Sequence, residues 1–176
     1  MNTTYSQMIV GVDNGVDGGL CAISRCRGCV ISKMVMPTLK RNGKSEVDLM
    51  AVKEWVNELN TEPCFVIEEP LHHAKSSQAV RSMAINFGKL LGACEMRMWE
   101  VNPITVREWQ KEMLGTVPKG KTKEVAKDIA MMLCPGEDWT RSERAVVPHD
   151  GMIDAYLIAE YWRKKSAFSD LKEKNN

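Results

Sequence analysis

Short apolar runs divide the first part of the chain, and two of them end on a carboxylate. Residues 8–12 (Met-Ile-Val-Gly-Val) lead into Asp13, and residues 64–67 (Cys-Phe-Val-Ile) lead into Glu68. Runs of this length, bounded by turn residues, are typical of buried strands. The next acid, Glu69, points to the opposite face of such a strand, so we expect Glu68 to be the inward carboxylate.

Two further acids lie in the last apolar segment, residues 149–159. Asp150 and Asp154 are four residues apart, so in a helix they share one face. Asp150 falls in the first turn, where the helix dipole favours negative charge. A buried carboxylate without a partner costs several kcal/mol and needs a cation, hydrogen bonds or a proton. Convergence around a divalent metal ion would compensate all four acids at once.

Each acid also has a simpler interpretation. Asp13 could hydrogen-bond the glycine turn that follows it. Asp150 could cap its helix, and Asp154 could pair with an arginine or a lysine. A set of acids paired off in this way would remove the reason for a metal.

Carboxylate oxygens suit Mg²⁺ or Mn²⁺ rather than zinc. Two such ions about 4 Å apart can clamp an in-line phosphoryl displacement, one activating water and the other stabilising the leaving 3′-oxygen. The acids therefore predict metal-dependent phosphoryl chemistry that requires no cysteine or serine nucleophile.

The order of the expected elements is that of an α/β domain with a mixed sheet covered by helices. A three-strand meander comes first, and strands then alternate with helices. We expect strands at 8–13, 20–24, 29–36, 64–68 and 95–101. We expect helices at 45–59, 76–92, 102–114, 122–133 and 149–165. Ser45 and the pair Asn102-Pro103 are the expected starts of the first and third helices.

The 176 residues predict a single domain, 1–176, with its core over about 8–165 and a polar, flexible tail over 166–176. The apolar (44%) and charged (27%) fractions are those of a soluble globular protein. No apolar run is long enough to span a membrane. The first seven residues have neither the basic region nor the apolar core of an export signal, so we expect a cytoplasmic protein.

Six cysteines lie in strand-like runs, at helix ends and in a turn, at positions 21, 26, 29, 64, 94 and 134. This placement indicates reduced thiols packed as small apolar side chains. Cys26-Arg27-Gly28-Cys29 has no second pair of ligands at the spacing of a zinc site. We therefore interpret the motif as a hairpin turn.

Three segments, taken in order, resemble the RuvC-like Holliday junction resolvases of the ribonuclease H-like superfamily, above all the compact bacteriophage type. They are residues 11–15 (GVDNG), 66–68 (VIE) and 149–155 (HDGMIDA). The stretch 102–115 and the lysine-rich helix after it fit the same resemblance, which spans about residues 8–162.

The resemblance implies a ribonuclease H-like fold whose five-stranded mixed sheet has the strand order 3-2-1-4-5. It also implies a homodimer that binds a four-way DNA junction and nicks two opposing strands with Mg²⁺. Asp13 resembles the first-strand aspartate of the family, Glu68 the fourth-strand glutamate and Asp154 the last-helix aspartate. In a phage-encoded enzyme these reactions would take place in the host cytoplasm.

The last helix departs from the family pattern at one position. Many bacterial members carry their other last-helix ligand three residues before the aspartate, and that position is Gly151 here. The acid is Asp150, four residues before. Asp150 is therefore the predicted fourth catalytic and metal-binding residue, and His149 is a lower-ranked ligand or proton carrier that could also be an ordinary helix-start residue.

The resemblance places the loop 71–75 near the centre of a bound junction. His72, His73 and Lys75 could contact DNA there, or form an ordinary polar loop. A second set of DNA contacts is predicted at the local basic stretch Lys119, Lys121 and Lys123, although a solvated helix surface has the same composition.

The helix over 76–92 would supply part of the dimer contact through Met83, Phe87 and Leu91, or these side chains could serve only the core. Two active sites held in a dimer would explain paired nicks. Selectivity for branched DNA would come from its shape and its phosphates.

Three other functions fit parts of the sequence. The turn 14–19 is similar to the glycine turn that actin-like or sugar-kinase-like ATPases place under phosphates, but those proteins need two lobes and give no role to Asp150 and Asp154. A related nuclease acting on flaps or RNA–DNA hybrids would use the same metal site. A catalytically inactive DNA-binding module would not need an intact set of acids.

Overall fold

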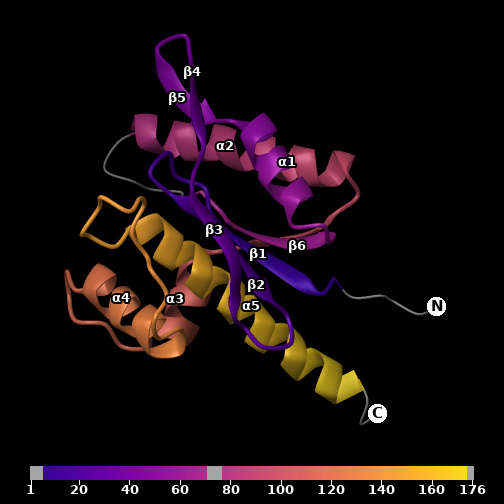
Figure 1. Cartoon of the computed structure of the whole chain (residues 1–176), viewed down its shortest axis with the longest axis vertical. Coiled ribbons are helices and arrows are strands. Elements are labelled where there is room, and N and C mark those ends of the chain that lie inside the picture. The colour runs from indigo at the N-terminus through magenta and orange to yellow at the C-terminus, as the bar shows by residue number, and fades with distance from the viewer. Residues whose placement is uncertain (1–5, 71–76, 174–176) are drawn as a thin grey trace.

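A computed structural model describes residues 6–70 and 77–173 and contains the expected α/β domain (Figure 1). Its main sheet has five strands: β1 (Met8–Asp13), β2 (Gly19–Ser24), β3 (Val30–Val35), β6 (Pro63–Glu68) and β7 (Glu100–Ile104). Their order is β3-β2-β1-β6-β7. β1, β2 and β3 form the antiparallel meander, whereas β6 and β7 run parallel to β1. Within this sheet the order is therefore the 3-2-1-4-5 pattern that the resemblance implies.

Helices cover both faces of the sheet, as Figure 1 shows. They are α1 (Leu49–Glu58), α2 (Ser77–Met96), α3 (Val106–Leu114), α4 (Thr122–Leu133) and α5 (Asp150–Glu173). Because side chains alternate along a strand, the sheet divides the apolar interior into two cores. One core lies between the sheet and α3, α4 and α5, and the other lies between the sheet and α1 and α2.

A two-stranded hairpin, β4 (Thr38–Arg41) and β5 (Lys44–Val47), stands apart from the main sheet. Asn42 and Gly43 form its tip with φ values of 51° and 74°, the conformation that Asn-Gly supplies in tight hairpins. The expected helix start at Ser45 is therefore wrong. The side chain of Asp48 caps α1 instead, because it accepts hydrogen bonds from the first free N–H groups of the helix.

The region around residue 100 also differs from the expectation. α2 continues to Met96, so the following strand occupies 100–104 instead of 95–101. Pro103 lies within β7, which is an edge strand and tolerates a residue without an N–H. Asn102-Pro103 therefore does not start α3. Thr105 caps that helix in a capping box with Glu108.

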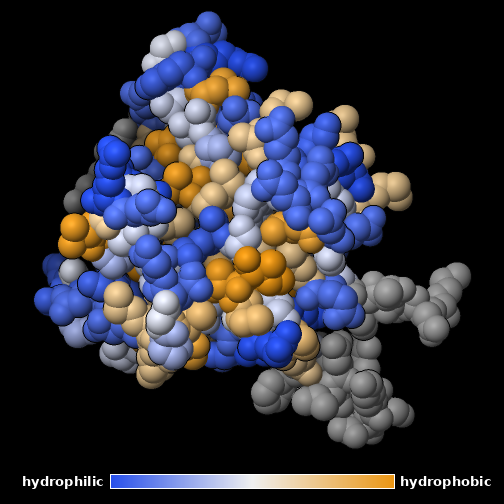
Figure 2. Space-filling model, in the orientation of Figure 1, coloured by the Kyte–Doolittle hydropathy of each residue, from blue (hydrophilic) through white to orange (hydrophobic). Residues whose placement is uncertain are grey.

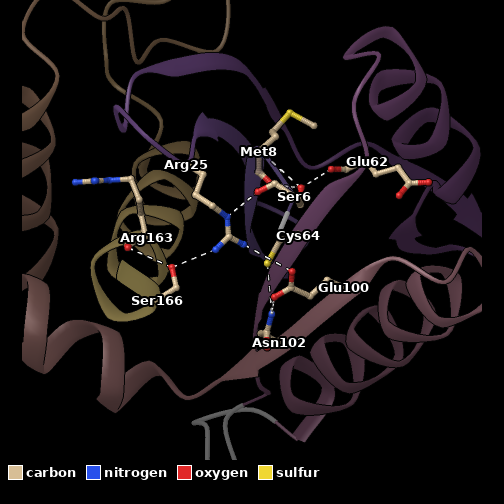
Figure 3. Close-up of polar contacts among 9 residues, drawn as sticks. All are labelled: Ser6, Met8, Arg25, Glu62, Cys64, Glu100, Asn102, Arg163 and Ser166. Atoms are coloured by element: carbon tan, nitrogen blue, oxygen red, sulfur yellow. Dashed lines mark hydrogen bonds and ion pairs between the residues drawn. The ribbon is translucent and has the colours of Figure 1, made fainter. Parts of the chain in front are cut away.

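The last helix is longer than expected, since α5 continues beyond 165 to Glu173. Its later turns are attached to the far end of the sheet through Arg25, which follows β2 (Figure 3). Arg25 donates to the backbone oxygen of Ser6 (2.6 Å) and to the hydroxyl of Ser166 (3.3 Å), and it pairs with Glu100 (3.7 Å). The guanidinium therefore connects β2, β7 and α5.

All six cysteines are free thiols. Cys26 and Cys29 are exposed in the turn between β2 and β3, which agrees with the interpretation of the motif as a hairpin turn. Within residues 6–70 and 77–173, no helix is long and apolar enough to cross a membrane.

Candidate active site

Asp13 and Glu68 end adjacent parallel strands at the same edge of the sheet. In the register of β1 and β6, Val12 lies opposite Ile67, so the two acids that follow are side by side. Val66, two residues before Glu68, packs in the core beneath α5. Glu68 therefore faces α5 as expected, and it is only 7% exposed.

The helix α5 approaches this edge closely because glycines remove the side chains between the two backbones. A Cβ atom on Gly11 would lie 2.0 Å from the backbone oxygen of Ala155. At the start of the helix, a Cβ atom on Gly151 would lie 2.5 Å from the carbonyl carbon of Gly18. These contacts hold the first turns of α5, and Asp154 with them, against the ends of β1 and β2.

Burial and mutual repulsion raise the pKa values of three acids. Burial raises the pKa of Glu68 to about 8, and the charges of Asp13 and Asp154 add to the rise. Burial, followed by the charges of Asp13 and Asp150, raises the pKa of Asp154 to about 7. Burial also raises the pKa of Asp13, although a hydrogen bond from the N–H of Gly15 opposes it. The charge of Asp13 thus acts on both Glu68 and Asp154, which places the three carboxyl groups near one another.

Lys123 on α4 faces the same site. Its ammonium group pairs with the carboxylate of Asp150, and its charge lowers the pKa of Asp13 and of Asp154. In the described part of the chain, Asp150 thus has an ion-pair partner, whereas Asp13, Glu68 and Asp154 have none. To act as a fourth ligand it would have to exchange Lys123 for a metal ion, and that role stays a prediction.

His149 precedes α5 and caps it. Its carbonyl oxygen accepts hydrogen bonds from the N–H groups of Met152 (3.1 Å) and Ile153 (3.2 Å), and its Nδ1 accepts from Met152 at 3.4 Å. The imidazole also lies near enough to Asp13 to lower its pKa. His149 is therefore a helix-start residue at the edge of the acid site, and its role as a ligand stays a prediction.

The donor atoms have the chemistry that a hard divalent ion requires, although their arrangement is not a metal-ligating geometry. In the described residues, no three Asp, Glu, His or Cys side chains form a ready metal-ligating group. In the same part of the chain, Asp13, Glu68 and Asp154 form no ion pair, and the buried Asn14 Oδ1 has no hydrogen-bond partner. Carboxylate and amide oxygens are the ligands that Mg²⁺ and Mn²⁺ prefer.

A cavity of about 460 Å³ opens beside the acids, within the size range of ligand sites. The turn after β1, the start of α4 and the segment before α5 form its walls. Lys123 and Arg141 contribute positive charge to the lining, and Asp17 and Asp150 contribute negative charge. Of the four predicted acids, Asp150 lines this cavity, so the cavity meets the acid site at the start of α5.

Sequence reasoning missed two residues that fix Glu68. The indole N–H of Trp109, on α3, donates to Glu68 Oε2 at 2.7 Å. The side chain of Asn14 donates to the backbone oxygen of Glu68. Trp109 gives no sequence signal beyond its place in an apolar helix stripe, and Asn14 is a common turn residue, so neither pattern indicates a contact with residue 68.

The other predicted contact residues are spread over the molecule. His72, His73 and Lys75 lie outside the described residues. Lys119 and Lys121 are exposed before α4, and Lys121 pairs with Glu124.

On α2, Met83, Phe87 and Leu91 are half-buried, and Phe87 packs against the core beneath α1 and α2. Their role in a dimer stays a prediction.

The metal-free protein is expected to lose stability as the pH rises from about 5 to 9. Glu68 and Asp154 have folded pKa values of about 8 and about 7, above the values near 4 of unfolded carboxyls. Their contribution is therefore complete at low pH and is lost as the pH rises through the folded values. We expect the melting temperature to fall by about 5–10 °C.

Melting scans in chelator across this pH range measure the effect. The variant Glu68→Gln/Asp154→Asn is the control, because it lacks both carboxyls and should show a flatter profile. A wild-type melting temperature that stays constant or rises from pH 6 to 9 would contradict the prediction.

The fold has solved counterparts, although no family model matches the sequence and no curated protein matches it. Thermus thermophilus RuvC in complex with a Holliday junction substrate is 12% identical, with a TM-score of 0.60 over 91% of this chain and 96% of that chain. A second T. thermophilus RuvC structure is 12% identical, with a TM-score of 0.54 over 90% and 96%. The yeast mitochondrial Holliday junction resolvase is 15% identical, with a TM-score of 0.61 over 90% and 78%. At these identities the likeness establishes the shared fold.

Proposed function

We propose that this chain, which has the fold of the RuvC-like resolvases, is a metal-dependent endonuclease that resolves four-way DNA junctions by paired nicks. The observation that supports this most is that Asp13 and Glu68 end adjacent strands beneath α5, where the charges of Asp13 and Asp154 act on the buried Glu68. A solved counterpart is a complex with a Holliday junction substrate, and the proposal extends that class of substrate to this chain.

Asp13, Glu68 and Asp154 would hold Mg²⁺, with Mn²⁺ as a substitute, two ions as the expected number and Asp150 as a fourth ligand. Bound divalent ions supply water activation and stabilisation of the leaving oxygen in phosphodiester hydrolysis. The chain itself keeps the carboxylates together against their repulsion. The register of β1 and β6 and the glycine contacts of α5 provide that constraint.

Paired nicks need two active sites, and a homodimer would supply them. The proposed contact is the face of α2 that carries Met83, Phe87 and Leu91. These side chains are half-buried in the single chain, so part of their apolar surface is still available to a second copy.

The ATPase alternative loses its main support in this structure. A Cβ atom on Gly18 would lie 2.1 Å from the backbone oxygen of Asp13, and one on Gly19 would lie 2.8 Å from the backbone oxygen of Gly151. Close packing of the turn against β1 and α5 therefore accounts for these glycines without a bound phosphate.

The test is cleavage of a labelled synthetic four-way junction, compared with a linear duplex, a flap and an RNA–DNA hybrid, in Mg²⁺, Mn²⁺ or chelator. We expect symmetric nicks in opposing strands of the junction with either ion, and no cleavage of the duplex. Preferential cleavage of the flap or hybrid would reassign the function to a related nuclease. If none of the substrates is cut in a metal-dependent way, the proposal is wrong.

The lysine patch, defined as Lys119, Lys121 and Lys123, gives a separate prediction. Replacing all three with glutamine should weaken junction binding and reduce the slope of log affinity against log salt by about 2 to 3, since each phosphate contact contributes about 0.9. Fluorescence anisotropy at several salt concentrations measures both quantities.

The far-end control for this experiment is Arg27→Gln/Arg97→Gln/Lys164→Gln. It also removes three exposed cations, but they lie in the β2–β3 turn, before β7 and late in α5, at the opposite end of the sheet. If the triple lysine variant has the same salt slope as wild type, the lysine patch is excluded from the DNA interface.

A further inference from the structure

A second cavity, of about 560 Å³, lies between the β4–β5 hairpin and the first turns of α2. We call it the hairpin groove. Arg41 and Lys44 line it from the hairpin, and Arg81 lines it from α2. All three are exposed, and no ion pair of theirs occurs within the described residues. The acid in the described lining, Glu46, is already paired with Lys89. The groove therefore carries uncompensated positive charge.

The groove lies at the same end of the molecule as the acid site. Val16, in the turn after β1, forms part of its lining. The hairpin itself projects from the top of the molecule in Figure 1, and Figure 2 shows mainly hydrophilic side chains over it. An anionic strand that leaves the acid site on this side would meet the groove.

Buried asparagines fix the distance between the groove and the acids. Asn86, on α2, accepts a hydrogen bond from the N–H of Val47 (3.1 Å) and donates to the backbone oxygen of Asn14 (3.2 Å). Asn14 in turn donates to the backbone oxygen of Glu68. One chain of hydrogen bonds thus connects the base of the hairpin with the end of β6, at Glu68. The ion pair of Lys89 with Glu46 holds the hairpin to α2 as well.

The side chains of the groove suit phosphates. The guanidinium groups of Arg41 and Arg81 can each bind a phosphate through two N–H donors. Asn42, Gln78 and Ser82 add neutral donors to the lining. Cations on two separate elements, spread along an open groove, favour an extended polyanion over a single small anion.

We propose that the hairpin groove binds the phosphate backbone of one arm of the DNA junction. The inference rests on the proposed function, because it takes the ligand to be the substrate of the acid site. The hairpin would then set the direction in which that arm leaves the active site, through backbone contacts that carry no sequence information.

The test is junction binding by the groove variant Arg41→Gln/Lys44→Gln/Arg81→Gln, made in an Asp154→Asn background that prevents cleavage. We expect at least about tenfold weaker binding near 0.15 M salt and a salt slope lower by about 2 to 3. The far-end control in the same background should bind within about twofold of its parent. Fluorescence anisotropy with a synthetic junction measures both, and a melting scan shows that each variant is folded.

Two further measurements separate the possible outcomes. The variant Arg41→Lys/Arg81→Lys keeps both charges, so it should keep most of the salt slope. If its salt slope falls as far as that of the groove variant, damage to the hairpin is the cause and the proposal is overturned. Shortening the arms of the junction should reduce the difference between parent and groove variant. Equal affinity of parent and groove variant on long arms would also overturn it. If the parent does not bind junctions at all, the proposed function itself fails.

Discussion

Asp154→Asn is expected to reduce junction cleavage by about 10³-fold or more while leaving junction affinity unchanged or slightly higher. The substitution removes one of the four carboxylates proposed to hold the metal, and losing about 4 kcal/mol of transition-state stabilisation corresponds to a factor of about 10³. The proposed phosphate contacts are made by lysines and arginines, which this substitution leaves in place, so binding should persist. Single-turnover cleavage and anisotropy on the same junction measure the two effects separately.

The same variant should gain stability in the absence of metal. At pH 8 the wild-type carboxyl, with a pKa of about 7, is ionised among other acids, and asparagine removes that repulsion. We therefore expect an equal or higher melting temperature in chelator, together with a smaller stabilisation by added Mn²⁺. Asp128→Asn, at an exposed acid of α4, is the matched control and should change none of these quantities. Cleavage within about tenfold of wild type would show that Asp154 is not a ligand.

Gly11→Ala is expected to destabilise the fold by at least about 3 kcal/mol. The added Cβ atom would lie 2.0 Å from the backbone oxygen of Ala155 and 2.7 Å from the backbone nitrogen of Ala159. Backbone atoms cannot relieve such a contact by a change of rotamer, so the whole of α5 would have to move. Overpacking of this kind costs about 1–3 kcal/mol and occasionally more, and a loss of about 3 kcal/mol corresponds to a fall in melting temperature of about 6–12 °C at this chain length.

Gly88→Ala provides the matched control. Gly88 lies within α2 and is exposed, and a Cβ atom added to it would point into open space. Alanine there should stabilise the helix by up to about 1 kcal/mol. Chemical denaturation compares the two variants, and a Gly11→Ala protein as stable as wild type would mean that α5 does not pack this closely on β1.

The strands of the main sheet and the place of two acids at strand ends could be predicted from short-range patterns, whereas the strand order was implied by the family resemblance. Apolar runs that end on Asp13 and Glu68 imply parallel strands with acids at one edge, and the structure has them in adjacent register. The hairpin also has a local signal in Asn42-Gly43. Ser45 and Asp48 together also fit the capping pattern of a helix start, which favours a helix where the hairpin signal favours a strand. In the structure only Asp48 caps a helix.

Contacts between distant residues could not be predicted in this way. Trp109 lies 41 positions from Glu68 and reaches it because α3 packs on α5, in the core that also contains Val66. Asn86 joins the end of β5 to the turn after β1, which are far apart in the sequence. Periodicity indicates which residues are buried, but it carries no information on which partner a buried polar group will find.

The helix that carries Asp154 is fixed at both ends. Glycine contacts hold its first turns on β1 and β2, and Arg25 holds Ser166 at the far end. Reorientation of α5 therefore cannot adjust the acids to substrates of different shape. Divergence in substrate range among descendants of this chain is expected to accumulate in the opposite wall, formed by α4 and the segment before α5, which can vary without displacing a carboxylate.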